Sequence, residues 1–160
     1  MVIDSRARLT RRQPAQLAPL RPSRTVSQPA LDLLGQAQAG LAEAAQLRPA
    51  GERYARAHLA ALRGAAAVLA ARAHPDTHSG TGAVRRRRLR SAWDLLCEVA
   101  PEMGEWAAFF AAGAAKRAAA EAGVSRAVTD READDLVRDV ETFLAVVATT
   151  VGSREGAEGG

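Results

Sequence analysis

Aromatic residues are scarce in this 160-residue chain: they make up 4% of the sequence, although apolar residues as a whole reach 48%. Alanine supplies much of the difference. It is the strongest helix former, and its small side chain lets helix backbones approach one another closely. β-branched residues are too scattered to sustain a period of two, which argues against a sheet. The sequence therefore predicts an all-α fold.

Cysteine is also nearly missing. The single thiol, Cys97, excludes an internal disulfide and a multi-cysteine metal site, and its apolar surroundings in the sequence predict that it is buried and inert. No apolar run approaches the ~20 residues of a membrane span, and the first residues lack the apolar core of a signal peptide. A cytoplasmic protein without membrane association is expected.

Charge is distributed unevenly along the chain. The net charge is +4, but residues 1–27 carry +5 and residues 74–90 carry +4, whereas residues 91–160 carry −7. Residues 1–27 contain three prolines and no apolar period, so a disordered basic tail is expected there. Residues 151–160 are expected to form a second disordered tail.

Five stretches between these tails have the apolar spacing of amphipathic helices. They are residues 29–47, 51–73, 89–100, 101–122 and 130–150. Pro49 and Pro101 end helical runs, Gly123 is suited to the position after a helix, and Thr129 with Glu132 forms a capping-box pattern. These signals predict one antiparallel bundle of about five helices over residues 28–150.

The second of these stretches contains Arg53 and His58, which are spaced as R-x4-H. Placed at 100° intervals, Tyr54 and His58 fall on the apolar face, whereas Arg53 falls with Arg56 on a face predicted to be solvated. Residues five apart are about 140° apart around one helix, so the two side chains do not converge on one phosphate. His58 is therefore interpreted as a hydrogen-bonded core or interface histidine, and no catalytic residue is assigned.

The loop that follows carries two further candidate sites. His74 and His78 flank an aspartate, but a glycine-rich loop with no converging fourth ligand does not predict a metal, and no cofactor is expected. The densest positive cluster comes next and consists of Arg85, Arg86, Arg87, Arg88 and Arg90. It is a candidate polyanion-binding site, although a solvated junction between loop and helix in an arginine-biased sequence is the simpler explanation.

Four segments together resemble the HEPN family, the higher eukaryotes and prokaryotes nucleotide-binding domain, and within it a small actinobacterial group. They are residues 52–63 (ERYARAHLAALR), 91–96 (SAWDLL), 105–113 (EWAAFFAAG) and 130–136 (DREADDL). Their order and spacing carry the resemblance, which covers roughly residues 30–148. It implies the same all-α bundle.

The resemblance also implies a choice of functions. Many HEPN proteins are RNA-cleaving toxins or partners of nucleotidyltransferases, with an R-x4–6-H motif late in the domain and paired copies that meet across a dimer. In this sequence no histidine follows His78, so the late motif is absent. The expectation is a non-catalytic module that binds a protein, an RNA or a nucleotide. The alternative is a ribonuclease that uses Arg53 and His58 across a homodimer interface.

Overall fold

The computed structural model describes residues 27–73 and 91–153, and all of the regular structure in these ranges is helical. The helices are α1 (Gln28–Gln46), α2 (Ala50–Arg72), α4 (Ala92–Val99), the 3-10 turn η1 (Pro101–Met103), α5 (Gly104–Ala112), α6 (Ala114–Glu121) and α7 (Asp130–Gly152). The predicted all-α bundle is confirmed. Among the described helices, none is long and apolar enough to cross a membrane.

Two helices begin with the reciprocal side-chain bonds of a capping box. The Ser91 hydroxyl accepts a hydrogen bond from the Asp94 backbone N–H, and the Asp94 carboxylate accepts one from the Ser91 backbone N–H. Thr129 and Glu132 make the same exchange at the start of α7, as their spacing predicts. Gly123 follows α6 with φ of +74°, a conformation that glycine adopts without strain.

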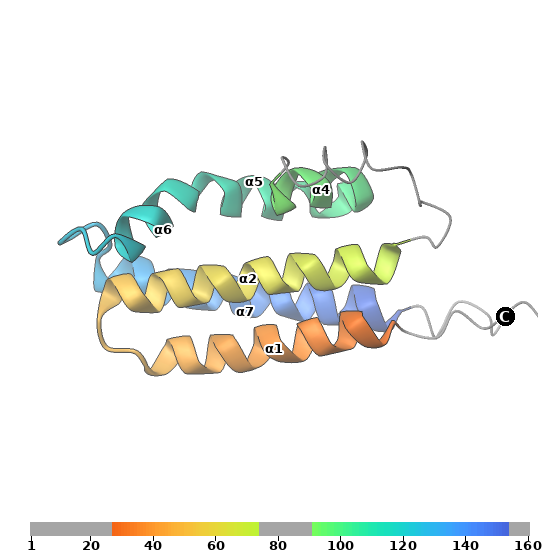
Figure 1. Ribbon diagram of the computed structural model, residues 1–160, viewed down its shortest axis with the longest axis horizontal. Coiled ribbons are helices and arrows are strands. Elements are labelled where there is room, and N and C mark those ends of the chain that lie inside the picture. Colours follow the sequence, from red (N-terminus) through yellow and green to blue (C-terminus); the bar gives the residue numbers. More distant parts are fainter. Residues whose placement is uncertain (1–26, 74–90, 154–160) are drawn as a thin grey trace, which may run out of the picture.

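In Figure 1, α1 and α2 run in opposite directions, and so do α6 and α7, whereas α6 continues the course of α5. α4 runs in the same direction as α2, because Trp93 lies beside His58 and the Val99 carbonyl accepts a hydrogen bond from Arg72 at the end of α2. α2 lies at the centre and contacts α1, α7, α4 and α6. α7 runs parallel to α2, because Arg53 and Asp130 meet at one end and Gly64 lies against Leu144 further along. In Figure 1, α4, α5 and α6 form one side of the bundle and α1 forms the other. Since α2 has neighbours on several sides, more of its surface is buried than one amphipathic face.

The contact between α1 and α2 depends on small side chains. Ala30, Ala37 and Ala44 recur every seven residues on α1 and are fully buried; we call them the alanine seam. Such residues let two helix backbones pack closely. The spacing of Leu31, Leu34 and Leu41 predicts one buried apolar stripe on this helix, and for Leu31 this is wrong, since it is exposed. The buried face of α1 is centred on alanine, and larger side chains lie at its edges.

The predicted helix 101–122 is divided in the structure. η1 comes first, α5 ends at Ala112, and α6 begins at Ala114. The break lies at Gly113, whose N–H bonds back to the Phe110 carbonyl three residues earlier. The same carbonyl also contacts His58 on α2. Helices are often interrupted where a side chain hydrogen-bonds to a backbone carbonyl of the helix.

Aromatic side chains form the centre of the contact between α4, α5 and α7. Trp93 and Phe110 stack with centroids 5.0 Å apart, and Phe110 also lies 5.0 Å from Phe143. Cys97 was predicted to be buried, but it is exposed, because α4 packs through Trp93 and Leu96 on one face only. The helical spacing of Trp106, Phe109 and Phe110 predicts that Phe109 also faces inward, but it is 46% exposed.

Candidate functional site

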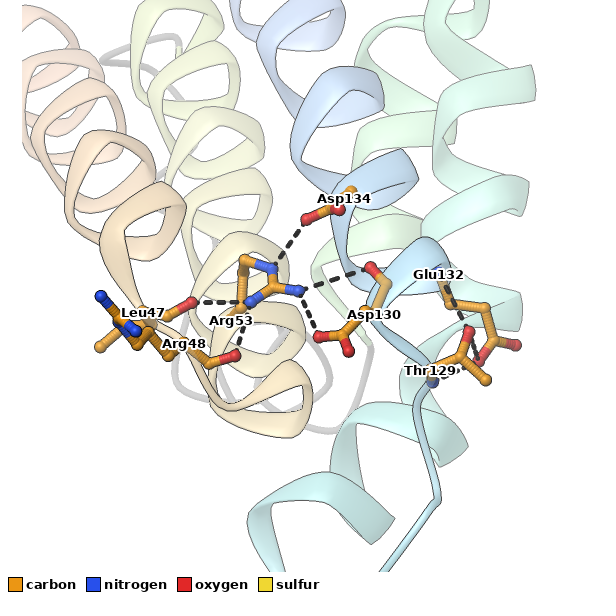
Figure 2. A network of polar contacts seen from close by, with 7 residues as sticks. All are labelled: Leu47, Arg48, Arg53, Thr129, Asp130, Glu132 and Asp134. Carbon is orange, nitrogen blue, oxygen red and sulfur yellow. Dashed lines mark hydrogen bonds and ion pairs between the residues drawn. The ribbon is translucent and has the colours of Figure 1, made fainter.

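Arg53, the first candidate, lies in the first turn of α2 and is 8% exposed (Figure 2). Its Nη1 donates to the carbonyl oxygens of Leu47 and Arg48, at 2.7 Å and 2.8 Å. Its Nη2 donates to the Asp130 carboxylate at 2.9 Å and points to the Asp130 carbonyl at 3.4 Å. Its Nε lies 3.0 Å from the Asp134 carboxylate, an ion pair without hydrogen-bond alignment. We call these five residues the Arg53 network.

The Arg53 network joins three elements: the turn after α1, the start of α2 and the first turns of α7. The prediction that Arg53 lies on a solvated face is therefore wrong. It failed because the periodicity of α2 alone does not reveal that the first turns of α7 cover this face. The many acidic residues of α7 predict a solvated face, but Asp130 and Asp134 also serve as partners for a buried cation.

His58, the second candidate, is 1% exposed, as expected of a core histidine. Its Nε2 lies 2.9 Å from the Phe110 carbonyl oxygen. A carbonyl only accepts, so Nε2 carries the proton and Nδ1 is unprotonated in the neutral ring. Nδ1 has no hydrogen-bond partner in residues 27–73 and 91–153. Burial lowers the pKa of His58, although the bond to Phe110 opposes this shift, so the ring is neutral at pH 7.

Aromatic rings hold the His58 imidazole in place from two sides. Trp93 and Phe110 both meet it edge to face, with centroids 5.9 Å and 6.0 Å away. The imidazole is therefore a packing element of the core as well as a hydrogen-bond donor. Arg53 points from the same helix toward α7, whereas His58 points toward α5. Within one chain the structure does not bring the two candidates together.

A pocket of about 260 Å³ opens beside His58. We call it the Phe109 pocket; its lining residues are Tyr54, His58, Phe109, Phe110, Ala112, Gly113, Lys116 and Leu136. They come from α2, α5, α6 and α7, so the bundle itself shapes the pocket. Gly113 is required here, because a Cβ at this position would lie 2.8 Å from the Tyr54 hydroxyl oxygen. Sequence periodicity gave no signal for this pocket, since its residues come from distant parts of the chain.

Ionisable groups beside the pocket are partly neutralised. Lys116 donates to the Glu132 carboxylate, and this bond raises the pKa of Lys116. The same bond, with those from Thr129, lowers the pKa of Glu132 to about 2. Burial raises the pKa of Tyr54, so its phenol is protonated at pH 7 and its O–H is available as a donor.

The remaining sequence candidates lie outside the described residues. These are His74 and His78 and the run Arg85, Arg86, Arg87, Arg88 and Arg90. In the part of the chain that the structure describes, no three His, Cys, Asp or Glu side chains lie close enough together to hold a metal ion. The polyanion site at Arg85–Arg90 stays a prediction.

The described helices form an all-α bundle, the fold class that the HEPN resemblance implies. Residues 42–148 match the family model HEPN_SAV_6107-like HEPN, well over half of the chain. The chain therefore belongs to this HEPN family. No curated protein and no solved structure matches it significantly.

Proposed function

We propose that this chain is a non-catalytic HEPN module that acts by binding a partner, and that the partner is a protein rather than an RNA or a nucleotide. The observation that carries the proposal is that both Nη groups of Arg53 and the protonated Nε2 of His58 already bond to groups inside the bundle. Each of the three guanidinium nitrogens of Arg53 lies within 3.4 Å of a protein oxygen. Its Nη donors are therefore engaged, and its Nε is paired with a carboxylate, before any phosphate arrives.

His58 is equally committed to the bundle. General acid–base catalysis needs a side chain within hydrogen-bond reach of the reacting atoms. The protonated nitrogen of His58 bonds to a core carbonyl, and the ring is 1% exposed between two aromatic rings. The imidazole is therefore held as part of the core rather than presented to a substrate.

Charge favours a protein partner over a nucleic acid for the folded body. The described residues contain 10 Arg and Lys side chains and 14 Asp and Glu side chains, a net charge of −4. A polyanion would be repelled from this surface, since affinity for nucleic acid depends mainly on neutralising phosphates. RNA or nucleotide binding would have to depend on the arginines at 85–90.

The alternative function is a ribonuclease that combines Arg53 of one copy with His58 of another across a homodimer. It requires both side chains to leave the bonds described above. The two functions are distinguished by incubating the purified full-length protein with a mixed RNA pool, beside His58→Gln. Glutamine keeps a donor for the Phe110 carbonyl, so the fold should persist, and circular dichroism checks this.

We expect the wild-type protein and His58→Gln to leave the pool equally intact. RNA cleavage by the wild type that disappears in a folded His58→Gln would reject the non-catalytic assignment. Sedimentation measurements on both proteins would then show whether the active form is a dimer.

A further inference from the structure

The Phe109 pocket has the size and lining of a site for one bulky apolar side chain. Its volume of about 260 Å³ is below the roughly 300–1,000 Å³ typical of sites for drug-sized ligands. Three of its eight lining residues are aromatic, and a leucine, two small residues and the Lys116 stem add to the apolar wall. A pocket of this kind suits the apolar anchor that a protein partner places at the centre of an interface.

Phe109 marks the edge of this pocket and remains largely uncovered. It is 46% exposed, although it touches Phe110 with ring centroids 5.1 Å apart and Trp106 with centroids 6.4 Å apart. Trp106, one turn earlier on α5, is itself only partly buried. A side chain entering the pocket would cover Phe109 and remove this apolar surface from water.

A polar group in the pocket is available to a ligand. Tyr54 is 7% exposed, and its hydroxyl makes no hydrogen bond within the described parts of the chain. It lies at the wall beside Gly113 and, as a protonated phenol, can donate to a backbone carbonyl of an incoming chain. In a pocket that is otherwise apolar, one free hydrogen-bond donor fixes the orientation of a bound ligand and makes its binding more specific.

Helical spacing places two acidic residues next to residues that line the pocket. Glu105 precedes Phe109 by one turn on α5, and Asp139 follows Leu136 by three residues on α7, so each lies on the same side of its helix as a lining residue. Neither carboxylate forms an ion pair among residues 27–73 and 91–153. Burial and the neighbouring Asp135 raise the pKa of Asp139, and the nearby Arg138 opposes this shift without cancelling it.

We propose that the Phe109 pocket is a docking site for a basic segment of a protein partner, which inserts one bulky apolar side chain beside Phe109 and places flanking Arg or Lys side chains against Glu105 and Asp139. This inference rests on the proposed binding function and names the class of partner. The apolar side chain supplies the buried contact, and the cations set the orientation and raise the association rate.

The test uses the full-length protein and a fluorescein-labelled 12-residue peptide with one leucine between two pairs of arginines. Binding is followed by fluorescence polarisation, with a Leu→Ser peptide and a peptide whose four arginines are glutamines as matched probes. We expect the first peptide to bind at least tenfold more tightly than either matched probe. Equal binding of all three, or of none at millimolar concentration, would overturn the inference.

Protein variants locate the site. Phe109→Ser and the pair Glu105→Gln with Asp139→Asn are each expected to weaken binding of the leucine peptide at least fivefold, and the charge variant should also reduce its salt dependence. Leu31→Ser is the matched control, because Leu31 is a similarly exposed apolar residue on α1. Thermal melts confirm that all variants are folded. Unchanged binding by folded Phe109→Ser would overturn the proposed site.

Other occupants would give different results. A monomer–dimer equilibrium that is lost in Phe109→Ser would identify a second copy as the occupant and overturn the proposal. Tenfold tighter peptide binding after Arg6, Arg8, Arg11 and Arg12 are changed to Ala would identify the N-terminal residues of this chain instead. RNA cleavage that depends on His58 tests the proposed function separately, so failure of the peptide alone rejects only the docking site.

Discussion

The guanidinium of Arg53 lies 2.9 Å from the carboxylate of Asp130, a residue 77 positions further along the chain. The pair joins the start of α2 to the first residue of α7. Its two members are unlike in environment, because the Arg53 side chain is 9% exposed and that of Asp130 is 81% exposed. The arginine therefore depends on its partners far more than the aspartate does.

Replacing Arg53 with Ala should lower the free energy of unfolding by about 2–3 kcal/mol, mainly because the carbonyl groups of Leu47 and Arg48 lose their donors. Asp130→Asn should cost less than about 1 kcal/mol, since the carboxylate is well solvated. Urea denaturation measures both values. Arg56→Ala, an exposed arginine on the same helix, is the control and should change stability by less than about 0.5 kcal/mol. An Arg53→Ala protein as stable as this control would contradict the importance of the network.

His58 predicts a dependence of stability on pH. Because its pKa is lowered in the folded protein, the unfolded chain binds a proton first as pH falls below about 6.5. Stability from the neutral ring is thus full above that pH, is lost as the pH falls toward the folded-state pKa, and levels off below it. His58→Gln should remove this dependence. The free energy of unfolding at pH 7.5, 6.5 and 5.5 is the measurement.

The Glu132 carboxylate does not obscure this window. Glu132 has a pKa of about 2 in the folded protein and an ordinary value of 4.5 when unfolded, so its contribution is lost only below pH 4.5. Identical pH profiles for the wild type and His58→Gln between pH 7.5 and 5.5 would show that the imidazole is not buried as described.

Gly113 provides a test of the close approach between α2 and the α5–α6 break. Gly113→Ala should destabilise the protein by about 1–3 kcal/mol, because the new Cβ would lie 2.8 Å from the Tyr54 hydroxyl oxygen. Tyr54→Phe removes that oxygen, so the double variant should recover much of the loss in a double-mutant cycle. Gly104→Ala, where a Cβ meets nothing within 4 Å, is the control and should be neutral or stabilising. Additive effects of the two substitutions would be inconsistent with a direct contact.

The arginines at positions 85–88 and 90 should bind polyanions without sequence preference. Five guanidinium groups that each neutralise one phosphate of single-stranded RNA would give a slope of roughly −3.5 in log K against log salt. Titration of labelled RNA between 50 and 200 mM salt checks this value, with a variant in which all five arginines are Ala beside it. Equal RNA binding by that variant would show that these five arginines do not form a polyanion-binding site.

Local signals in the sequence predicted local structure well. The capping box of Thr129 set the start of α7, and Pro49 and Gly123 mark the ends of helices where the structure has them. What failed depended on contacts between distant segments. The burial of Arg53 follows from its aspartate partners on α7, and the break at Gly113 lies where His58 reaches the carbonyl of Phe110. Periodicity within one helix cannot reveal which helices surround it.

The candidate site was predictable only where its residues follow the pattern of a single helix. His58 was interpreted as a core histidine from its position on the apolar face, and the structure confirms this. The Phe109 pocket could not have been predicted, because its residues come from four helices whose packing no local pattern encodes. The exposure of Cys97 was missed for a related reason, since α4 is covered on one side only.

The alanine seam has a consequence for the order of folding. Its three residues join α1 to α2, two helices connected by the three residues 47–49. Contacts between segments so close in sequence have low contact order and cost little loop entropy, so this hairpin is suited to serve as the folding nucleus. The bond between Arg53 and Asp130 spans 77 residues and closes later. Changes in the alanine seam should therefore slow folding, whereas loss of Arg53 should mainly speed unfolding and so shorten the lifetime of the native state.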